Sequence, residues 1–572
     1  DEDFKLVIPS ELSAFKKLSG VQNAWELFDQ VICPIDSVKP IYSRQGWSNE
    51  RLQESNQERF LDLVNAGWDL IVVDEAHKLG GTNSQVARHR LGQSLAQAAP
   101  YILLLSATPH QGKSDAFLRL MSLLDPIAFT SEDELDRDTV SEYVLRTEKR
   151  KAIDIEGKPH FKKRNTSLVP VYFGEKSERQ KLLYEAVTAY VREGYRRALN
   201  QKQNYIGFLM LLMQRLVASS TAAIARALEK RLEALSDTDD QMTLPLDLDS
   251  FSFAEFEEMN NSEEIGFPGI FKVKPFVNEA ERVRYLLGLA RAVEFEENDA
   301  KALKLLEIIQ TIRMEEMNPE VKILIFTEFV ATQKMLQKFL EERGFSVCIL
   351  NGSMSLEERL KAQRSFAKKA QILISTDAGG EGLNLQFCHV VVNYDMPWNP
   401  MKIEQRIGRV DRIGQSLDVK AFNLAIESTV EFRVIEVIQR KLQVILDEFG
   451  VDKTGDVLDS TEAADIFDDI FVAAITDPDN LEKLVDSSLE RIRQQIIVSK
   501  ESGRLLPADS SIGSEEVRKL IDQPVHYWLE RAVISFVRSK EGKAVKLGDN
   551  WKVFLQGEIE EEVICFSRND DS

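Results

Sequence analysis

The sequence predicts an α/β protein with parallel sheets, and two observations support that prediction. Short apolar runs typical of buried parallel strands end in polar residues at 68–73, 101–105, 322–326, 346–350, 371–375 and 390–394. Helical patterns fall between the strands of the later group, which is the βαβ rhythm of a parallel sheet. Because open α/β sheets bind ligands at the carboxyl ends of their strands, the polar residues there are the first functional candidates.

Two strand ends in the first part of the chain carry such candidates. The run at 68–73 ends in Asp74-Glu75-Ala76-His77, and the run at 101–105 leads into Ser106-Ala107-Thr108-Pro109. A carboxylate pair at a strand end can hold Mg²⁺ and polarise a water, yet acids often end strands simply as solvated residues. Either tetrapeptide alone is therefore a weak signal. Their order along the chain strengthens the functional interpretation.

The most informative stretch lies between residues 372 and 415. It contains Gly379 to Gln386, then Asp395 to Pro400, then Gln405 to Gln415. Arginines at positions 406, 409 and 412 recur every three residues, which in a helix puts them near one face, with planar forks suited to phosphate. The glycines upstream allow backbone amides to approach an anion closely. We therefore predict a phosphate-binding surface here.

Taken in order, these segments resemble the Swi/Snf family of helicase-superfamily ATPases, over roughly residues 20 to 440. The resemblance implies two RecA-like motor lobes with parallel sheets, the first of them incomplete, a helical insertion and a mostly helical C-terminal region. The expected division is lobe one at 1–170, the insertion at 171–290 with an acidic loop at 237–264, lobe two at 291–440 and an accessory region at 441–572.

The resemblance implies ATP and Mg²⁺ as cofactors, and it gives individual residues roles. Asp74 is expected to hold Mg²⁺, and Glu75 is expected to polarise the attacking water. Arg409 and Arg412, with Gln405 beside them, reach the γ-phosphate when the lobes close. The expected nucleotide site also includes His77, Gly380 and Gly382. The expected nucleic-acid contacts, mostly to the backbone, are Ser106, Thr108, Thr327, Gly352, Ser375, Thr376, Trp398 and Asn399.

One expected part does not occur in this sequence. A motor of this type needs a phosphate loop, Gly-x-x-x-x-Gly-Lys-Ser/Thr, and no such string precedes Asp74. Gly112-Lys113-Ser114 is a decoy, because it follows no strand of its own and lies downstream of the acid pair. We expect the chain to begin part-way through lobe one, with the loop on an upstream piece.

Charge is unevenly distributed along the chain. The net charge of −21 argues superficially against nucleic acid, which is bound by neutralising phosphates with Lys and Arg. Residues 237–264, however, hold ten acids and no Lys or Arg, whereas a basic band runs from Arg146 to Arg164. The band resembles the family's arginine-lysine block at the end of lobe one, but a solvated face explains it equally well.

The amino-acid composition indicates the cellular compartment expected for the protein. Four scattered cysteines lack metal-ligand spacing and indicate core thiols of a cytosolic protein, so zinc is not expected. The sequence shows no signal peptide and no eighteen-residue apolar stretch. We expect a cytoplasmic protein that does not interact with membranes.

The predicted substrate is double-stranded DNA. Within the family the sequence resembles bacterial members, the RNA-polymerase-associated RapA/HepA type and the helicases of phage-defence systems such as DISARM, which makes RNA polymerase or defence-system subunits the expected protein partners. Two other classes stay open: a motor-like scaffold that binds DNA or a partner without hydrolysis, and a helicase that unwinds RNA or DNA. Trp398-Asn399-Pro400 and Arg412 to Gln415 favour the duplex-DNA translocase.

Overall fold

A computed structural model of the chain describes most of residues 20–236, 278–438 and 461–502. The gaps within these ranges are 43–46, 81–86, 107–113, 132–134, 136–138, 141–142, 146–157, 202–203, 297–298, 381–382 and 477–479. Shorter described pieces are 4–7, 12, 15–16, 529, 533, 536–537, 543–547, 550–554 and 562–565. The predicted acidic loop at 237–264 and the first part of the basic band, at 146–157, lie outside the described residues.

The first lobe contains two pairs of parallel strands in its described part. Strand β1 (Lys5–Leu6) pairs with β2 (Val31–Ile32), and β3 (Leu70–Val73) pairs with β4 (Tyr101–Leu104). Strands β3 and β4 are the two predicted at 68–73 and 101–105. The α-helices around them are α2 (Ile35–Val38), α3 (Asn49–Asn56), α4 (Asp62–Val64), α5 (Ala87–Ala98) and α6 (Ser114–Leu124). Trp25, Phe60 and Leu91 form part of one core, and Leu79 with Leu123 belongs to another beneath β3.

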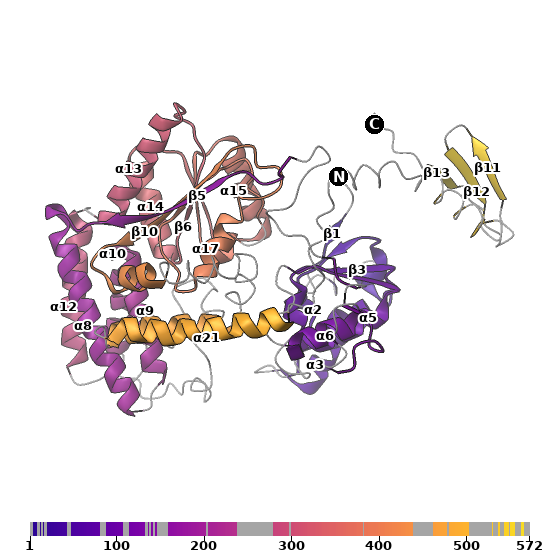
Figure 1. The fold of residues 1–572 in the computed structure, drawn as a ribbon, viewed down its shortest axis with the longest axis horizontal. Helices are drawn as coiled ribbons and strands as arrows, with labels where there is room; N and C mark the ends of the chain where they lie inside the picture. Colours follow the sequence, from indigo (N-terminus) through magenta and orange to yellow (C-terminus); the bar gives the residue numbers. More distant parts are fainter. Residues whose placement is uncertain are drawn as a thin grey trace. The chain divides into compact units, whose positions relative to one another are not determined.

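The second lobe is built on a six-stranded parallel sheet (Figure 1). Its spatial order is β5 (Arg164–Val171), β10 (Val419–Ile426), β9 (Val390–Asn393), β6 (Ile323–Phe326), β8 (Ile372–Ser375) and β7 (Val347–Leu350). The four predicted strands, β6 to β9, are confirmed within a residue or so. Strands β5 and β10 were not predicted, and they pair over eight residues from Arg164↔Val419 to Val171↔Ile426.

Helices cover both faces of this sheet. Because successive strand residues point to opposite faces, Ile323 and Ile325 pack under α13 (Ala300–Glu315) and α14 (Val330–Glu341). Leu324 and Phe326 pack on the other side, with α15 (Leu356–Lys368) and α17 (Pro400–Ile407). The α/β fold with a doubly covered parallel sheet is thus the one expected of a RecA-like lobe.

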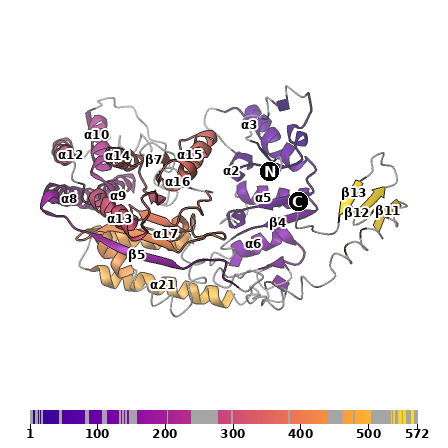
Figure 2. The ribbon, with the colours of Figure 1, turned by 90° about the horizontal axis from the view of Figure 1, so that it is seen from above.

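A helical bundle accompanies the second sheet. Its helices α8 (Glu178–Gln201), α9 (Asn204–Ser219), α10 (Thr221–Ser236) and α12 (Glu279–Glu296) lie together in both views (Figures 1 and 2). Helices α20 (Thr461–Thr476) and α21 (Leu481–Ser502) contribute to the same core. The apolar run from Leu209 to Met213 is buried, whereas Leu182 is 52% exposed and does not share the buried face of α8 with Leu183.

The chain divides into two compact units, and the second consists of residues 146–161 and 509–572. That unit contains an antiparallel sheet of β11 (Lys543–Leu547), β12 (Asn550–Phe554) and β13 (Glu562–Cys565). The register Leu547↔Asn550 joins β11 and β12 in a hairpin. Across the described part of the chain, we find no helix with the length and apolar character needed to cross a bilayer.

Candidate functional site

The carboxylate pair lies at the carboxyl end of β3, and its backbone is unusual. Glu75 has φ 50° and ψ 43°, the left-handed region that residues other than glycine seldom adopt. The backbone N–H of Glu75 donates to Asp74 Oδ1 over 2.9 Å, and both side chains are exposed. Such conformations cost of the order of 1–3 kcal/mol and cluster at functional sites. The turn aims two carboxylates out of the sheet edge.

The loop after β4 is fixed against this turn. Leu105 N–H donates to Val73 O over 2.8 Å and Ala76 N–H donates to Leu105 O over 2.8 Å, which extends the β3–β4 pairing past both strand ends. His77 Nδ1 lies 3.1 Å from Ser106 Oγ and 3.3 Å from Glu75 Oε2. Burial lowers the pKa of His77, so the ring is neutral near pH 7. The structure thus brings Asp74, Glu75, His77 and Ser106 together, whereas Thr108 lies outside the described residues.

The predicted arginine face is wrong in one respect. Only Arg406 of the three arginines lies in α17, which ends at Ile407, and it is 3% exposed. Its guanidinium donates to both Asp377 oxygens over 2.5 and 2.7 Å and to Asp395 O over 2.7 Å. Arg406 therefore holds the second lobe together and is not available to a phosphate. The three-residue spacing does not put the three arginines on one helical face, because the helix ends before the second arginine.

Arg409 and Arg412 lie in the turns that follow α17, and both are half-buried. Arg412 Nε donates to Gly408 O over 2.9 Å, and Leu385 N–H donates to Arg409 O over 3.1 Å. Gln386 Nε2 donates to Ile413 O over 2.5 Å, so the segment after Gly382 is tied to the arginine turn. Gln405 is exposed on α17. The three candidates for the nucleotide are thus neighbours on one anchored segment.

The glycines before this segment have a packing role. A Cβ on Gly379 would lie 2.6 Å from Asn351 Cα and from Leu350 O, and one on Gly380 would lie 2.9 Å from Phe326 Cε1. Glycine is therefore required by the close approach of α16 (Asp377–Gly380) to the ends of β6 and β7. Gly380 itself is buried, and Gly382 lies outside the described residues.

Several predicted nucleic-acid contacts end strands of the second sheet, but three of them are buried. Thr327, Ser375 and Thr376 are 0%, 0% and 5% exposed. Their hydroxyl groups bond to the chain itself: Thr327 Oγ1 donates to Asp395 Oδ2, Ser375 Oγ donates to Thr376 O, and Thr376 Oγ1 accepts from Gly379 N–H. Gly352 is half-exposed at the end of β7, where its carbonyl accepts from Arg359 over 2.6 Å.

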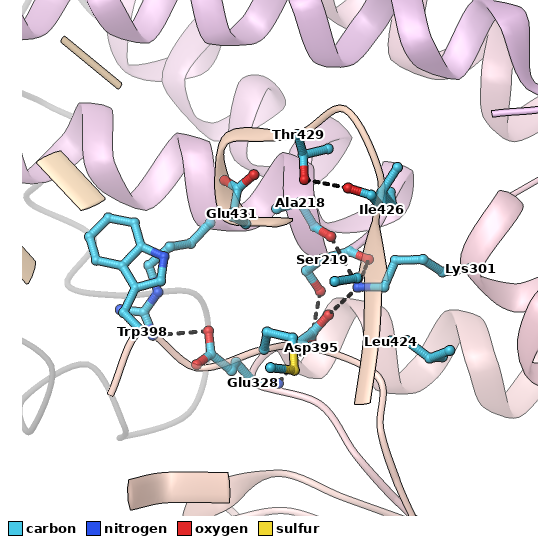
Figure 3. A pocket seen from close by; sticks show the side chains of 13 residues that line it. Ala218, Ser219, Lys301, Glu328, Asp395, Trp398, Leu424, Ile426, Thr429 and Glu431 are labelled. Atoms are coloured by element: carbon cyan, nitrogen blue, oxygen red, sulfur yellow. Dashed lines mark hydrogen bonds and ion pairs between the residues drawn. The ribbon is translucent and has the colours of Figure 1, made fainter. Parts of the chain in front are cut away.

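A buried polar network, which the sequence did not reveal, organises the ends of β6 and β9 (Figure 3). Lys301 Nζ lies 2.9 Å from Asp395 Oδ1, while Ser219 Oγ and Glu328 N–H donate to Asp395 Oδ2 over 2.9 and 3.0 Å. Burial alone would raise the pKa of Asp395, but Lys301 and the hydrogen bonds from Thr327 and Glu328 keep it below its usual value. The carboxylate is therefore ionised, and it ties the helical bundle to the sheet.

Trp398 faces into the helical bundle, not outward as expected of a nucleic-acid contact. It is 4% exposed and stacks on Phe471 of α20, with ring centroids 4.8 Å apart and planes at 2°. The guanidinium of Arg215 lies 5.5 Å from the centroid of the Trp398 ring. Asn399, half-buried, caps α17 by accepting from Met401 N–H over 2.9 Å. Trp398, Arg215, Lys301 and Asp395 also line a cavity of about 30 Å³, which has room for water only.

The comparisons with known proteins agree with this arrangement. Residues 21–218 match the SNF2-related domain, and residues 300–414 match the helicase conserved C-terminal domain. The two matches follow one another in the order of the two lobes. The chain belongs to the Swi/Snf family of helicase superfamily two.

Individual family members are similar over most of this chain. The uncharacterized ATP-dependent helicase YqhH of Bacillus subtilis is 28% identical over 73% of the chain and 64% of its own length. The RNA polymerase-associated protein RapA of Proteus mirabilis is 30% identical over 73% of the chain, but the chain covers only 40% of RapA. Among solved structures, the SWI2/SNF2 ATPase core of Sulfolobus solfataricus in complex with double-stranded DNA is 19% identical over 80% of this chain and 79% of its own, with a TM-score of 0.29, too low to support any argument.

Proposed function

We propose that the chain is part of an ATP-dependent motor that moves along double-stranded DNA. The observation that carries the proposal is the turn after β3, where Glu75 holds a left-handed backbone and presents its carboxylate with that of Asp74 at the sheet edge. Membership of the Swi/Snf family supports the same function. We infer a cytoplasmic setting from the bacterial relatives.

Asp74 fits magnesium that arrives with a nucleotide. Mg²⁺ in such sites is held by one or two carboxylates together with phosphates and waters, not by an all-protein cage. The described residues contain no group of three or more His, Cys, Asp or Glu side chains placed to hold a metal, so the acid pair is the candidate they offer. Bound there, the metal would neutralise negative charge on the phosphates.

The chain's own residues would then divide the work. Glu75 orients and polarises the attacking water, and its neutral neighbour His77 links the position of the turn to Ser106. Arg409 and Arg412, with Gln405, neutralise charge on the γ-phosphoryl group when the lobes close, which ties hydrolysis to movement. The DNA backbone runs along the carboxyl edge of the second sheet, where Gly352 and Asn399 are accessible and the buried Thr327, Ser375 and Thr376 shape the loops.

The phosphate loop of such a motor does not occur among these 572 residues. We therefore expect a polypeptide of this sequence alone to hydrolyse ATP negligibly, because the amides and lysine that cradle the β- and γ-phosphates are missing. This observation favours the second candidate, a scaffold that binds DNA or a partner without hydrolysis. Brisk DNA-stimulated turnover by the full-length protein would eliminate that candidate.

A pair of assays on the full-length protein tests the translocase proposal. A motor that tracks the duplex backbone displaces a third strand from a triplex without opening base pairs, and its DNA-stimulated turnover falls steeply with salt. Triplex displacement and unwinding of a forked duplex are measured side by side. Efficient unwinding without triplex displacement would favour the RNA- or DNA-unwinding helicase instead.

The protein partner follows from the relatives only as a proposal. RapA is named for its association with RNA polymerase. We propose RNA polymerase or the subunits of a phage-defence system as the partner of this chain. Affinity purification of the tagged full-length protein from its native cells, with and without phage challenge, distinguishes the two.

A further inference from the structure

A charged hollow lies between helices α10, α12 and α14, separate from the sites described above. It has a volume of about 260 Å³ and is lined by Ala222, Ala225, Arg226, Glu229, Lys230, Glu294, Val330, Ala331 and Lys334. This is below the ~300–1,000 Å³ of typical small-molecule pockets, and the lining is mostly charged, not apolar. Such a hollow fits a charged group on a larger molecule better than an enclosed small ligand.

Three cations dominate the hollow. Arg226 and Lys230 lie one turn apart on α10, and Lys334 lies on the first turns of α14. Arg226 and Lys334 are exposed and Lys230 is half-buried. In the part of the chain that the structure describes, no ion pair occupies any of the three. The three cations thus converge on one hollow in a chain whose net charge is −21.

The two carboxylates of the lining do not cancel this charge. Glu229 is paired with Arg291 over 2.7 Å. Burial, together with the nearby Glu229, raises the pKa of Glu294. The balance of the hollow is therefore positive.

The hollow is preformed, and part of its lining belongs to the first turn of α14, which comes soon after the carboxyl end of β6. Arg231 and Glu279, 1% exposed each, form a two-bond ion pair of 2.8 Å that fixes α10 against the start of α12. Val330 and Ala331 begin α14 directly after the loop of Thr327 and Glu328, and no side chain caps that helix end. The free amides of the first turn add positive potential to the hollow.

We propose that Arg226, Lys230 and Lys334 bind backbone phosphates of duplex DNA, so that the helical insertion extends the DNA path of the second lobe. The inference rests on the proposed DNA motor function. It adds a DNA contact made by the insertion itself. This contact has no base specificity, because the charged groups that face the hollow interact with backbone phosphates and not with base edges.

The test compares two triple variants of the full-length protein. One is Arg226→Gln/Lys230→Gln/Lys334→Gln. The other removes three exposed cations elsewhere, Arg433→Gln/Lys483→Gln/Arg491→Gln, and so matches the change in net charge. Fluorescence anisotropy with a labelled duplex gives the binding constant at several salt concentrations. In the first variant only, we expect the slope of log binding constant against log salt to become less negative by roughly 0.9 for each phosphate that is no longer neutralised.

Two results would overturn the proposal: equal slopes and affinities for the wild type and the first variant, or equal reductions in both variants. Unchanged duplex binding by the first variant, with RNA polymerase binding abolished, would assign the hollow to a protein partner. If the wild type itself does not bind duplex DNA, the proposed motor function fails, and this inference fails with it. Unchanged melting temperatures establish that the substitutions leave the fold intact.

Discussion

The guanidinium of Arg215 lies 2.9 Å from the carboxylate of Glu328, and only 9% and 8% of the two side chains is exposed. Arg215 belongs to α9 of the helical bundle, whereas Glu328 lies two residues after the end of β6. The ion pair therefore joins the bundle to the loop that also carries Thr327. Since that loop lies where the DNA path is proposed, Arg215 acts as a positioning residue for it.

Glu328→Gln should lower the free energy of unfolding by about 3 kcal/mol, because it removes the buried carboxylate charge that pairs with Arg215. Differential scanning calorimetry should show the shift in the transition of the second lobe. The exposed pair Lys338–Glu342, 72% and 49% exposed, provides the control, and Glu342→Gln should cost less than about 1 kcal/mol. Equal effects of the two substitutions would contradict the role given to Arg215.

Glu75→Gln should abolish ATP turnover by the full-length protein while ATP and DNA binding persist. The amide fits the same left-handed backbone but no longer polarises the water, and Asp74 still supplies charge for the metal. Steady-state hydrolysis and binding titrations measure the two effects. Asp69→Asn, an exposed acid at the other end of the strand, is the control and should remain active. Undiminished turnover in Glu75→Gln would remove this residue from the role.

Arg406 and Arg409 should respond differently to truncation. Arg406→Ala should lower the melting temperature of the second lobe, because it leaves the Asp377 carboxylate and Asp395 O without their donor. Arg409→Ala should keep most of the stability and lose DNA-stimulated turnover, provided that nucleotide still binds. Thermal unfolding and turnover are measured on both variants. If the Arg406→Ala variant is stable but inactive, the result would instead support the predicted phosphate-binding surface of three arginines.

Asp395→Asn should destabilise the second lobe by about 3–5 kcal/mol at neutral pH, since it leaves Lys301 buried and unpaired. The folded-state pKa of Asp395 is lowered, so its contribution is fully present above the unfolded-state value of about 4 and is lost as the pH falls through the folded value. The difference in stability between wild type and variant should thus be constant from about pH 5 to 7 and shrink in acid. Lys301→Met/Asp395→Asn should recover part of the stability. A difference in stability that grows in acid would contradict a lowered folded-state pKa for Asp395.

Much of the fold follows from local pattern in the sequence. Strands β3, β4 and β6 to β9 are short apolar runs that end in polar residues. In β6, β8 and β9 both faces of the parallel strand are buried, as such runs indicate, whereas β3 and β4 expose alternate residues, with Leu70 56% and Tyr101 70% exposed. Strands β5 and β10 were not predicted, because their sequences mix polar and apolar residues. These sequences are Arg-Asn-Thr-Ser-Leu-Val-Pro-Val and Val-Lys-Ala-Phe-Asn-Leu-Ala-Ile. Strand β5 pairs with β10 across more than 200 positions, and β10 also pairs with β9, so both strands depend on pairing that no local pattern encodes.

The candidate site was predictable only in part, for the same reason. The turn at Asp74 and Glu75 stands out because a motif and a strand end coincide. The Lys301–Asp395 and Arg215–Glu328 pairs join residues 94 and 113 positions apart, and a charged residue destined for the interior looks like any surface residue in sequence. Trp398 likewise looked like a ligand-facing aromatic, yet its partner Phe471 lies on a helix for which the sequence shows no motif.

Strand β5 fastens the helical insertion to the second lobe. Residues 164–171 are hydrogen-bonded along their full length to β10, and Arg164 is paired with Glu404 over 2.6 Å, so the chain joins the second sheet before the bundle helices begin. Helix α13 and β6 return it to that same sheet afterwards. Both ends of the insertion are therefore anchored in one sheet. In a working motor, Arg226 and Lys230 would therefore release and rebind DNA phosphates whenever the second lobe moves. The insertion would then move along the DNA together with that lobe.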